Sequence, residues 1–354
     1  MQKEVKREFT KMEREILESL KNWQQIIRRY QTPSVPKAVR QLLNTFIPFI
    51  GFWVLMYLSL DWSIWITLAL GVINGLITAR IFIIQHDCGH QSFFKSKKLN
   101  NIVGIVCSFF STLPYKYWAK VHAFHHGHTQ QLEFRDIGDI PTLTVNEFRE
   151  ASRWRRFRYR VFRNPFILFF ISPLAYVIIS NRFPFVNMKG WKGTGRAQLI
   201  NNILIIAVYA TLAYLLGWKK FLLIQFFIVA IFSIVAFWFF YVQHQHEEAY
   251  KQWRKDWVFL LAAIRGSTYY KLPKIMNWFT GNIAFHHIHH LSPRIPNYNL
   301  EKCAQENPVL QKYVTAINFR ESLKYAMNKL WDEESQRMIT FREYYRNERL
   351  RLAA

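Results

Sequence analysis

The chain alternates between long apolar segments and segments rich in charged residues. Four apolar segments, at about 41–60, 62–84, 199–217 and 221–242, are each long enough to cross a lipid bilayer, which takes about 20 apolar residues. The mean hydropathy lies near zero because it averages these segments with highly charged ones. The pattern therefore predicts an all-α integral membrane protein with four transmembrane helices.

Two further apolar stretches, 101–115 and 164–181, are shorter or broken by proline and have basic residues on both flanks. A single crossing by either would separate the polar clusters described below, so we interpret both as interfacial or membrane-dipping segments. Residues 1–40 are predicted to hold an amphipathic helix over 10–30, which either lies on the membrane or packs on the cytoplasmic part. Residues 41–335 form the membrane domain, and 336–354 form a charged tail. The charged, helically periodic stretch 298–354 is expected to supply cytoplasmic helices that cap the site.

The distribution of positive charge predicts how the chain is oriented in the membrane. Lys and Arg outnumber Asp and Glu by 47 to 23, and the excess flanks the apolar segments, as in cytoplasmic loops. The basic N-terminus places residue 40 in the cytoplasm, and very short outer turns near Asp61 and Gly217 return the chain to that side. The charge also suits anionic headgroups. A nucleic-acid partner is not expected, because no basic-aromatic recognition module appears. Three cysteines without CxxC spacing indicate a reducing compartment and no disulfide framework.

All twelve histidines fall into four short clusters, near residues 86–90, 122–128, 244–246 and 286–290. Neutral imidazole is the commonest metal-ligating side chain, and scattered surface histidines would not leave every connecting segment empty. More than four such ligands exceed the need of one tetrahedral zinc, so two metal ions are expected. His86 and His90 are four residues apart, and His122, His125 and His126 follow the spacing HxxHH, which His286, His289 and His290 repeat. On a helix each set shares one face.

These clusters resemble the three histidine boxes of integral-membrane fatty acid desaturases. The similar segments are HDCGHQSFF, HAFHH and GNIAFHHIHHLSPRIPNYNLEKC, with QLLNTFIPF and FYVQHQHEE around them, and the resemblance covers about residues 40–335. It is greatest to bacterial, Bacillus-like Δ5-type acyl-lipid desaturases. The resemblance implies a non-haem di-iron enzyme that uses O2 and two electrons to insert a cis double bond into phospholipid acyl chains. In that family the histidine after the last span, here His244, also binds iron.

The expected metal ligands are nine histidines: His86, His90, His122, His125, His126, His244, His286, His289 and His290. His287 lies about 100° around a helix from His286, so we expect it, like His128 and His246, to lie outside the ligand set. Four carboxylates near the boxes could orient imidazoles or be ordinary solvated groups: Asp87, Asp136, Asp139 and Glu247. No histidines remain for an attached haem domain, so electrons are expected from a separate protein such as a ferredoxin or flavodoxin on the basic cytoplasmic face.

Two other functions compete with desaturation. A di-iron hydroxylase or monooxygenase would use the same residue types, and only the flanking similarity favours a desaturase. A zinc-binding receptor or transporter should place polar residues at mid-membrane depth, where Asn74 and Gln225 are the main exceptions in the four segments. HExxH is absent, which argues against a zincin protease. The sequence leaves open the position of the double bond and whether the acyl chain arrives as a phospholipid or a thioester.

Overall fold

The computed structural model describes residues 8–186, 188 and 190–353, and it is mostly helical, as predicted. Its four longest helices are each long and apolar enough to cross a membrane: α3 (Val35–Ser59), α4 (Ile64–Gly89), α10 (Thr194–Leu216) and α11 (Trp218–His244). At 1.5 Å per residue, a helix of 23–27 residues spans about 35–40 Å. The predicted all-α membrane fold with four candidate spans is therefore confirmed.

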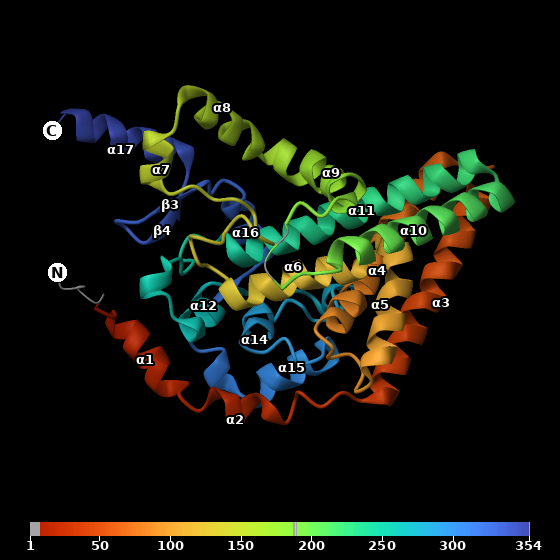
Figure 1. The fold of residues 1–354 in the computed structure, drawn as a ribbon, viewed down its shortest axis with the longest axis horizontal. Coiled ribbons are helices and arrows are strands. Elements are labelled where there is room, and N and C mark those ends of the chain that lie inside the picture. The colour runs from red at the N-terminus through yellow and green to blue at the C-terminus, as the bar shows by residue number, and fades with distance from the viewer. Residues whose placement is uncertain (1–7, 187, 189, 354) are drawn as a thin grey trace.

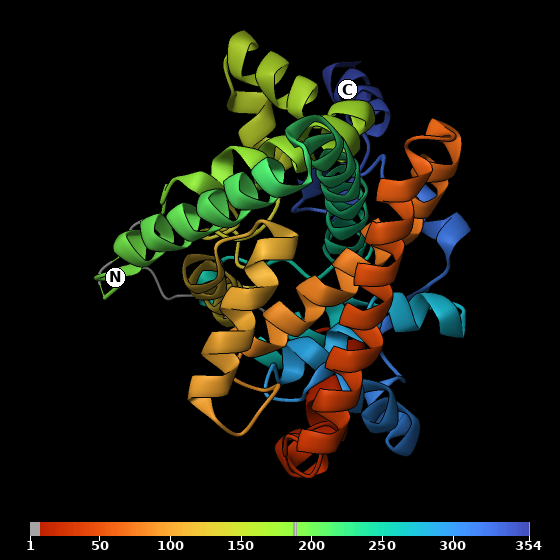
Figure 2. The same cartoon turned by 90° about the vertical axis from the view of Figure 1, so that its right-hand side faces the viewer.

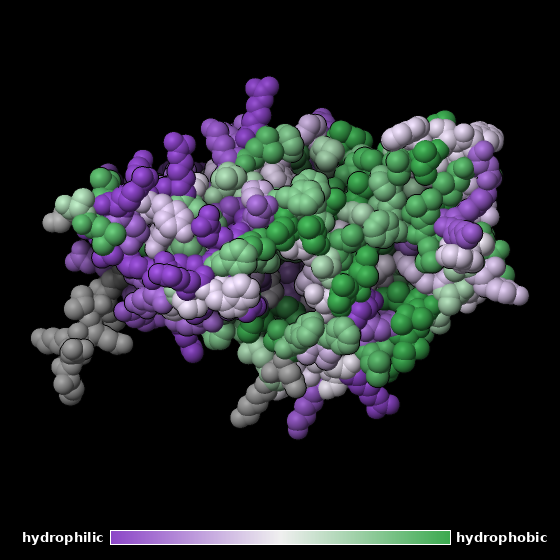
Figure 3. Space-filling view, turned by 90° about the horizontal axis from the view of Figure 1, so that it is seen from above, coloured by the Kyte–Doolittle hydropathy of each residue, from purple (hydrophilic) through white to green (hydrophobic). Residues whose placement is uncertain are grey.

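The four helices form two hairpins whose short turns meet at one end of the molecule. Asp61, in the α3–α4 turn, forms an ion pair with Lys220 at the start of α11, and the Tyr57 hydroxyl donates to the Leu216 carbonyl at 2.8 Å. Apolar side chains gather over these helices, whereas polar residues gather over the end that carries both termini (Figure 3). Ile206 and Leu215 on α10 are 65% and 67% exposed, as expected of side chains that face lipid.

The two shorter apolar stretches differ from each other. The first forms α5 (Lys97–Ser111), which packs on α4 and is not long enough to be a candidate span. The second follows α8 (Arg153–Phe162) as a π-helix (Ile167–Ile171), α9 (Ser172–Ile178) and a short 3-10 turn (Ser180–Arg182), bent by 60° from α8. By length and composition this bent pair could make a fifth span, so the four-crossing topology stays a prediction.

The polar half surrounds the C-terminal ends of α4 and α11, which lie away from the two short turns (Figures 1 and 2). Its helices are α1 (Lys11–Ser19), α2 (Trp23–Arg28), α6 (Tyr115–His128), α7 (Val145–Glu150), α12 (Phe259–Arg265), α13 (Lys274–Phe279), α14 (His286–Leu291), α15 (Asn297–Glu306), α16 (Phe319–Tyr325) and α17 (Phe341–Ala353), with 3-10 turns at Arg254–Asp256 and Pro308–Leu310. Its strands are β1 (Thr268–Tyr270), β2 (Thr315–Ile317), β3 (Leu330–Asp332) and β4 (Arg337–Ile339).

The strands correct one expectation, because helices alone were predicted after residue 298. β2 pairs in parallel with β1, and β3 pairs antiparallel with β4. Each strand is three residues long, too short for the two-residue period of a strand to be read from the sequence. The predicted tail also packs on the domain: Tyr344 of α17 is buried with Phe148 and Leu330, and Arg149 forms an ion pair with Glu348.

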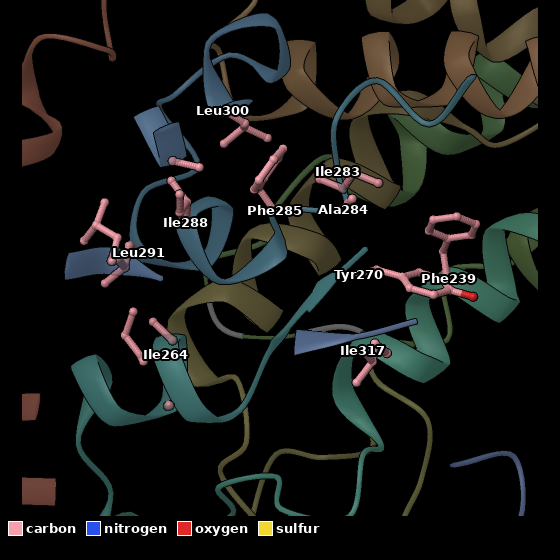
Figure 4. Packing of buried hydrophobic residues seen from close by; sticks show 14 of the residues in the cluster. Phe239, Ile264, Tyr270, Ile283, Ala284, Phe285, Ile288, Leu291, Leu300 and Ile317 are labelled. Atoms are coloured by element: carbon pink, nitrogen blue, oxygen red, sulfur yellow. The ribbon is translucent and has the colours of Figure 1, made fainter. Parts of the chain in front are cut away.

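The N-terminal amphipathic segment packs on the polar half. It breaks at Leu20 into α1 and α2, and Ile16, Leu20 and Ile27 are almost fully buried. They join the main hydrophobic cluster, in which side chains of α12, α14 and α15 pack together (Figure 4). The Trp23 ring lies 5.9 Å from that of Phe259 on α12. The apolar face of this segment is therefore used inside the protein.

Candidate metal centre

Four segments bring histidines to one place, at the end of the candidate membrane helices that lies away from the two short turns. His86 lies in the last turn of α4, and His90 caps that helix, with its backbone N–H donating to the His86 carbonyl at 3.1 Å. His244 is the last residue of α11. The other ligand candidates lie on α6 and α14, where both HxxHH sets are helical, as predicted. The segment that joins α13 to α14 can approach α4 because Gly281, with φ +52°, presents no side chain to Ile83.

The first cluster contains five histidines, which come from α4, α6 and α14. One nitrogen of each lies within 4.8 Å of one nitrogen of every other: His86, His90, His122, His126 and His289. The Nε2 atom of His126 lies 3.1 Å from that of His122 and 3.0 Å from that of His289. This cluster joins residues separated by up to 203 positions in the chain, from His86 to His289, and it can hold one metal ion.

The second cluster contains His125, His244 and His290, again within 4.8 Å of one another. His286 adjoins it, because its Nε2 lies 2.9 Å from that of His244 and 3.1 Å from that of His290. The two clusters touch: the His126 ring stacks on the His290 ring with centroids 4.2 Å apart. All nine predicted histidines are thus assembled, in two adjacent groups.

The distances between Nε2 atoms suit metal coordination. Neighbouring Nε2 atoms lie 2.9–3.3 Å apart. Two imidazole nitrogens bound at about 2.1 Å and at right angles on one ion would be about 3.0 Å apart. His90 Nε2 is also buried and has no hydrogen-bond partner among the described residues. A bound cation would satisfy these nitrogens, so the donor set fits two ions.

Burial keeps the imidazoles in the neutral form that binds metals. Desolvation is the largest cause of the lowered pKa of His122, His126 and His289, and neighbouring histidines lower each pKa further. Burial likewise lowers the pKa of His286 and His290. A protonated imidazole has no free lone pair for a metal ion, and a group of buried positive charges would repel. These histidines of both clusters are therefore neutral at neutral pH and able to bind cations.

Outer partners fix the orientation of two of the rings. His86 Nδ1 lies 3.1 Å from Oδ1 of the buried Asp87 carboxylate, and Asp87 Oδ2 accepts from both the backbone N–H and the side-chain amide of Asn297, at 2.6 and 2.8 Å. His244 Nδ1 lies 3.2 Å from the Gly266 carbonyl. An Nδ1–H that donates outward leaves Nε2 free to face the ion.

The other carboxylates named from the sequence have different roles. Glu247 forms an ion pair with Arg337 and faces solvent. Asp139 accepts from the Ile140 N–H and acts on His125 only at a distance, raising its pKa against the larger lowering by burial. Asp136 is exposed. Of the four, only Asp87 touches a predicted ligand.

Three histidines stay outside both clusters, as expected. His287 is fully buried, so it is no surface residue, and its Nε2 lies 3.0 Å from the Gln311 amide nitrogen. His246 Nε2 lies 3.1 Å from the Arg265 carbonyl. His128 stacks on Phe124 and lies 3.0 Å from its carbonyl through Nδ1. Burial lowers the pKa of His287 and of His246 to about 3.

Sequence reasoning missed three residues that pack around the centre. The Gln130 amide nitrogen lies 3.3 Å from His244 Nδ1 and donates to the Gly266 carbonyl at 2.6 Å. Asn297 holds Asp87, and Trp118 stacks on His122 with centroids 4.7 Å apart. Asn297 lies in a segment that carries the resemblance, but nothing in its residue type identifies its partner.

Comparison with known proteins agrees with this geometry. The family model described as "Fatty acid desaturase" matches residues 62–321. A "Fatty acid desaturase" of Bacillus subtilis is 44% identical over 317 residues, 89% of either chain. The chain belongs to the fatty acid desaturase family. It is therefore an oxidoreductase of lipid metabolism.

More distant desaturases also match. An "sn-1 oleoyl-lipid 12-desaturase" of Picosynechococcus is 25% identical over 279 residues, 75% of either chain. An "sn-1 acyl-lipid omega-3 desaturase (ferredoxin)" of Synechocystis is 27% identical over 251 residues, 68% of this chain and 67% of the relative. These desaturases differ in the bond they introduce, so the Δ5 position stays a prediction.

Proposed function

We propose that this desaturase inserts a cis double bond into the acyl chains of membrane phospholipids, using O2 and two electrons from a separate donor protein. The observation that carries the proposal is the position of the two histidine clusters at the ends of α4 and α11, two of the four candidate membrane helices. The acyl chains of a bilayer would therefore lie beside helices whose ends carry the clusters. The relatives named as acyl-lipid desaturases support the same substrate class.

The cofactor in this proposal is a pair of iron ions. The five-histidine cluster would hold one ion, and His125, His244, His286 and His290 would hold the other. When bound, iron supplies the O2 chemistry needed to remove hydrogen from an unactivated methylene, which acid or base side chains cannot do. The overall balance takes two hydrogens from the acyl chain, and two electrons with two protons from the donor side, to reduce O2 to two waters.

The protein's own residues orient and shield the reacting groups. Asp87 and the Gly266 carbonyl set the tautomers of His86 and His244. Aromatic rings cover the clusters, since Trp118 stacks on His122 and Phe240 lies 5.4 Å from His125. Such walls exclude water and hold the ligands in one geometry.

We place the enzyme in the cell membrane with its metal clusters on the cytoplasmic side. The basic segments next to the polar half support this orientation under the positive-inside rule. An acidic donor such as a ferredoxin or flavodoxin would be attracted to this basic side. The Synechocystis relative carries ferredoxin in its name, which supports a ferredoxin as the donor.

Two alternatives make different measurable predictions. A hydroxylase would leave an alcohol in the acyl chain. A zinc receptor or transporter would contain zinc and leave lipids unchanged. Metal analysis of the purified protein should give two irons per chain and little zinc.

The direct test is the lipid composition of cells that express the chain. Gas chromatography–mass spectrometry should reveal a new unsaturated acyl chain in the phospholipids, and derivatisation would locate its double bond. His286→Ala should abolish the product, because His286 Nε2 lies beside those of His244 and His290. The adjacent His287→Ala, at a residue that faces Gln311 instead, should retain substantial activity. A hydroxylated product would replace this proposal with the first alternative, and equal loss in the two variants would refute the ligand assignment.

A further inference from the structure

A polar cavity lies beside the metal centre, between the start of α3 and the segment from α13 to α15. Its volume is about 650 Å³, which is within the range of small-molecule sites. In Figure 1 this region is the lower end of α3, next to α15. Asn44, Asn277 and Asn282 contribute amide groups to its walls, and no histidine lines it. The cavity is thus separate from the two clusters.

The walls of the cavity carry an excess of positive charge. Four cations and one carboxylate line it: Lys37, Arg40, Arg80 and Lys274, and Glu301. Among the described residues, none of the four cations forms an ion pair. Cationic walls without counter-ions favour an anionic ligand.

Arg80, on α4, is the most informative of these cations, because it is buried in the protein and only 7% exposed. Its guanidinium stacks on Trp278 at 4.4 Å, and Nε donates to the Thr45 hydroxyl at 2.9 Å. It also donates to the Trp278 carbonyl. All these partners are neutral. A buried charge is costly unless it is paired, so a ligand anion in the cavity would supply the counter-charge.

The depth of the cavity matches that of lipid headgroups. Lys37 and Arg40 lie in the first turns of α3, and the uncharged part of this candidate span begins at Gln41. Arg80 lies six residues before His86 on α4, about 9 Å along the helix axis. A group held here would sit at the membrane surface, one to two helical turns from a metal ligand.

A chain of buried hydrogen bonds joins the cavity wall to that ligand. The Gln41 side chain, which lines the cavity, donates to Asn297 Oδ1 at 2.9 Å. Asn297 also lines the cavity and donates its amide to Asp87 Oδ2, and Asp87 Oδ1 lies 3.1 Å from His86 Nδ1. The same residue, Asn297, therefore faces the cavity and supports the metal centre.

We propose that this cavity binds the phosphate group of a glycerophospholipid headgroup and thereby positions the acyl chain at the metal centre. The inference rests on the proposed function and names the part of the substrate that is recognised. Arg80 and Lys274 would meet the phosphate oxygens, and the amides of Asn44, Asn277 and Asn282 would bind polar headgroup or glycerol oxygens.

Calorimetric titration of the purified full-length protein in detergent tests the site directly. The probe is dihexanoyl phosphatidylglycerol, and the matched ligand without phosphate is dihexanoylglycerol. The phosphate-bearing lipid should bind at least tenfold more tightly. Inorganic phosphate and coenzyme A are the two non-lipid phosphate sources, and both should bind more weakly than the lipid.

The variant Arg40→Gln/Lys274→Gln removes two exposed cavity cations and leaves the buried residues intact. At about 1 kcal/mol per charge, its affinity for phosphatidylglycerol should fall about thirtyfold. The control Lys95→Gln/Lys98→Gln makes the same charge change at exposed residues near the start of α5 that do not line the cavity, and it should bind like the wild type.

Equal binding of the two lipids, or wild-type affinity in the cavity variant, would overturn the headgroup site. Tighter binding of inorganic phosphate or coenzyme A than of the lipid would overturn it too, in favour of a site for soluble phosphate compounds. Desaturation of membrane lipids by the wild type is measured in parallel. If it is present while the binding tests fail, only the headgroup site is wrong; if it is absent, the proposed function fails on its own test.

Discussion

Asp87→Asn should weaken the metal centre although it removes no ligand. The Asp87 side chain is 1% exposed and engages three donors, His86 Nδ1 and the two nitrogens of Asn297. An amide has a single acceptor oxygen. If that oxygen faces Asn297, the amide N–H groups point at His86 and favour the tautomer with the proton on Nε2, which cannot bind metal. If it faces His86, two donors of Asn297 lose their acceptor.

The two orientations set the expected size of the effect. Loss of support for a metal-bound histidine lowers metal affinity by about 10–100-fold, and an unpaired buried donor costs about 1–3 kcal/mol of stability. Iron per chain after dialysis against a chelator, measured by plasma mass spectrometry, and the thermal midpoint should both fall. Asp136→Asn makes the same charge change at an exposed residue and serves as the control. If Asp87→Asn kept the iron content and midpoint of that control, the positioning role of Asp87 would be refuted.

Three further predictions concern packing, pH and topology. Gly104→Ala should cost about 1–3 kcal/mol of stability, because the new Cβ would overlap the buried Tyr115 ring. The control Gly51→Ala, whose Cβ would have no atom within 4 Å, should not destabilise the protein. Equal thermal midpoints in the two variants would contradict the packing of α5. Burial lowers the pKa of Lys329 to about 7, so the unfolded chain binds more protons than the folded chain between pH 7 and 10.5, and wild-type stability should rise over that range. The gain in unfolding free energy from Lys329→Met should therefore be larger at pH 6.5 than at pH 9. A gain independent of pH would contradict this. For topology, single cysteines are tested with an impermeant thiol reagent. In intact cells the reagent should label cysteines near the two short outer turns, and it should label cysteines at three other positions only after the membrane is opened. The positions are Asp61 and Lys219, and then Lys97, Asn146 and Lys192. External labelling at position 146 would refute the one-sided metal centre.

Sequence alone determined the features that follow a local period. Four apolar segments specified the candidate spans, because about 20 uncharged residues are sufficient to form one. The HxxHH spacing specified which imidazoles of α6 and α14 share a face, and it separated His286, which lies beside His244 and His290, from His287, which faces Gln311. The three cysteines were expected to be free, and all are buried without a disulfide.

Only the tertiary structure decided which distant residues meet. His125 and His244 are 119 positions apart in the chain, yet their Nε2 atoms lie 3.3 Å apart. The division of the nine histidines into two groups depends on how α4, α6, α11 and α14 pack. Asp87 looked equivalent to Asp136 in the sequence, but only Asp87 reaches a ligand. Nothing in the sequence singled out Arg80, because its burial against Trp278 beside the cavity depends on the packing of α13 on α4. Periodicity fixes the face of a helix on which a side chain lies, and the packing of helices far apart in the chain fixes what that face contacts.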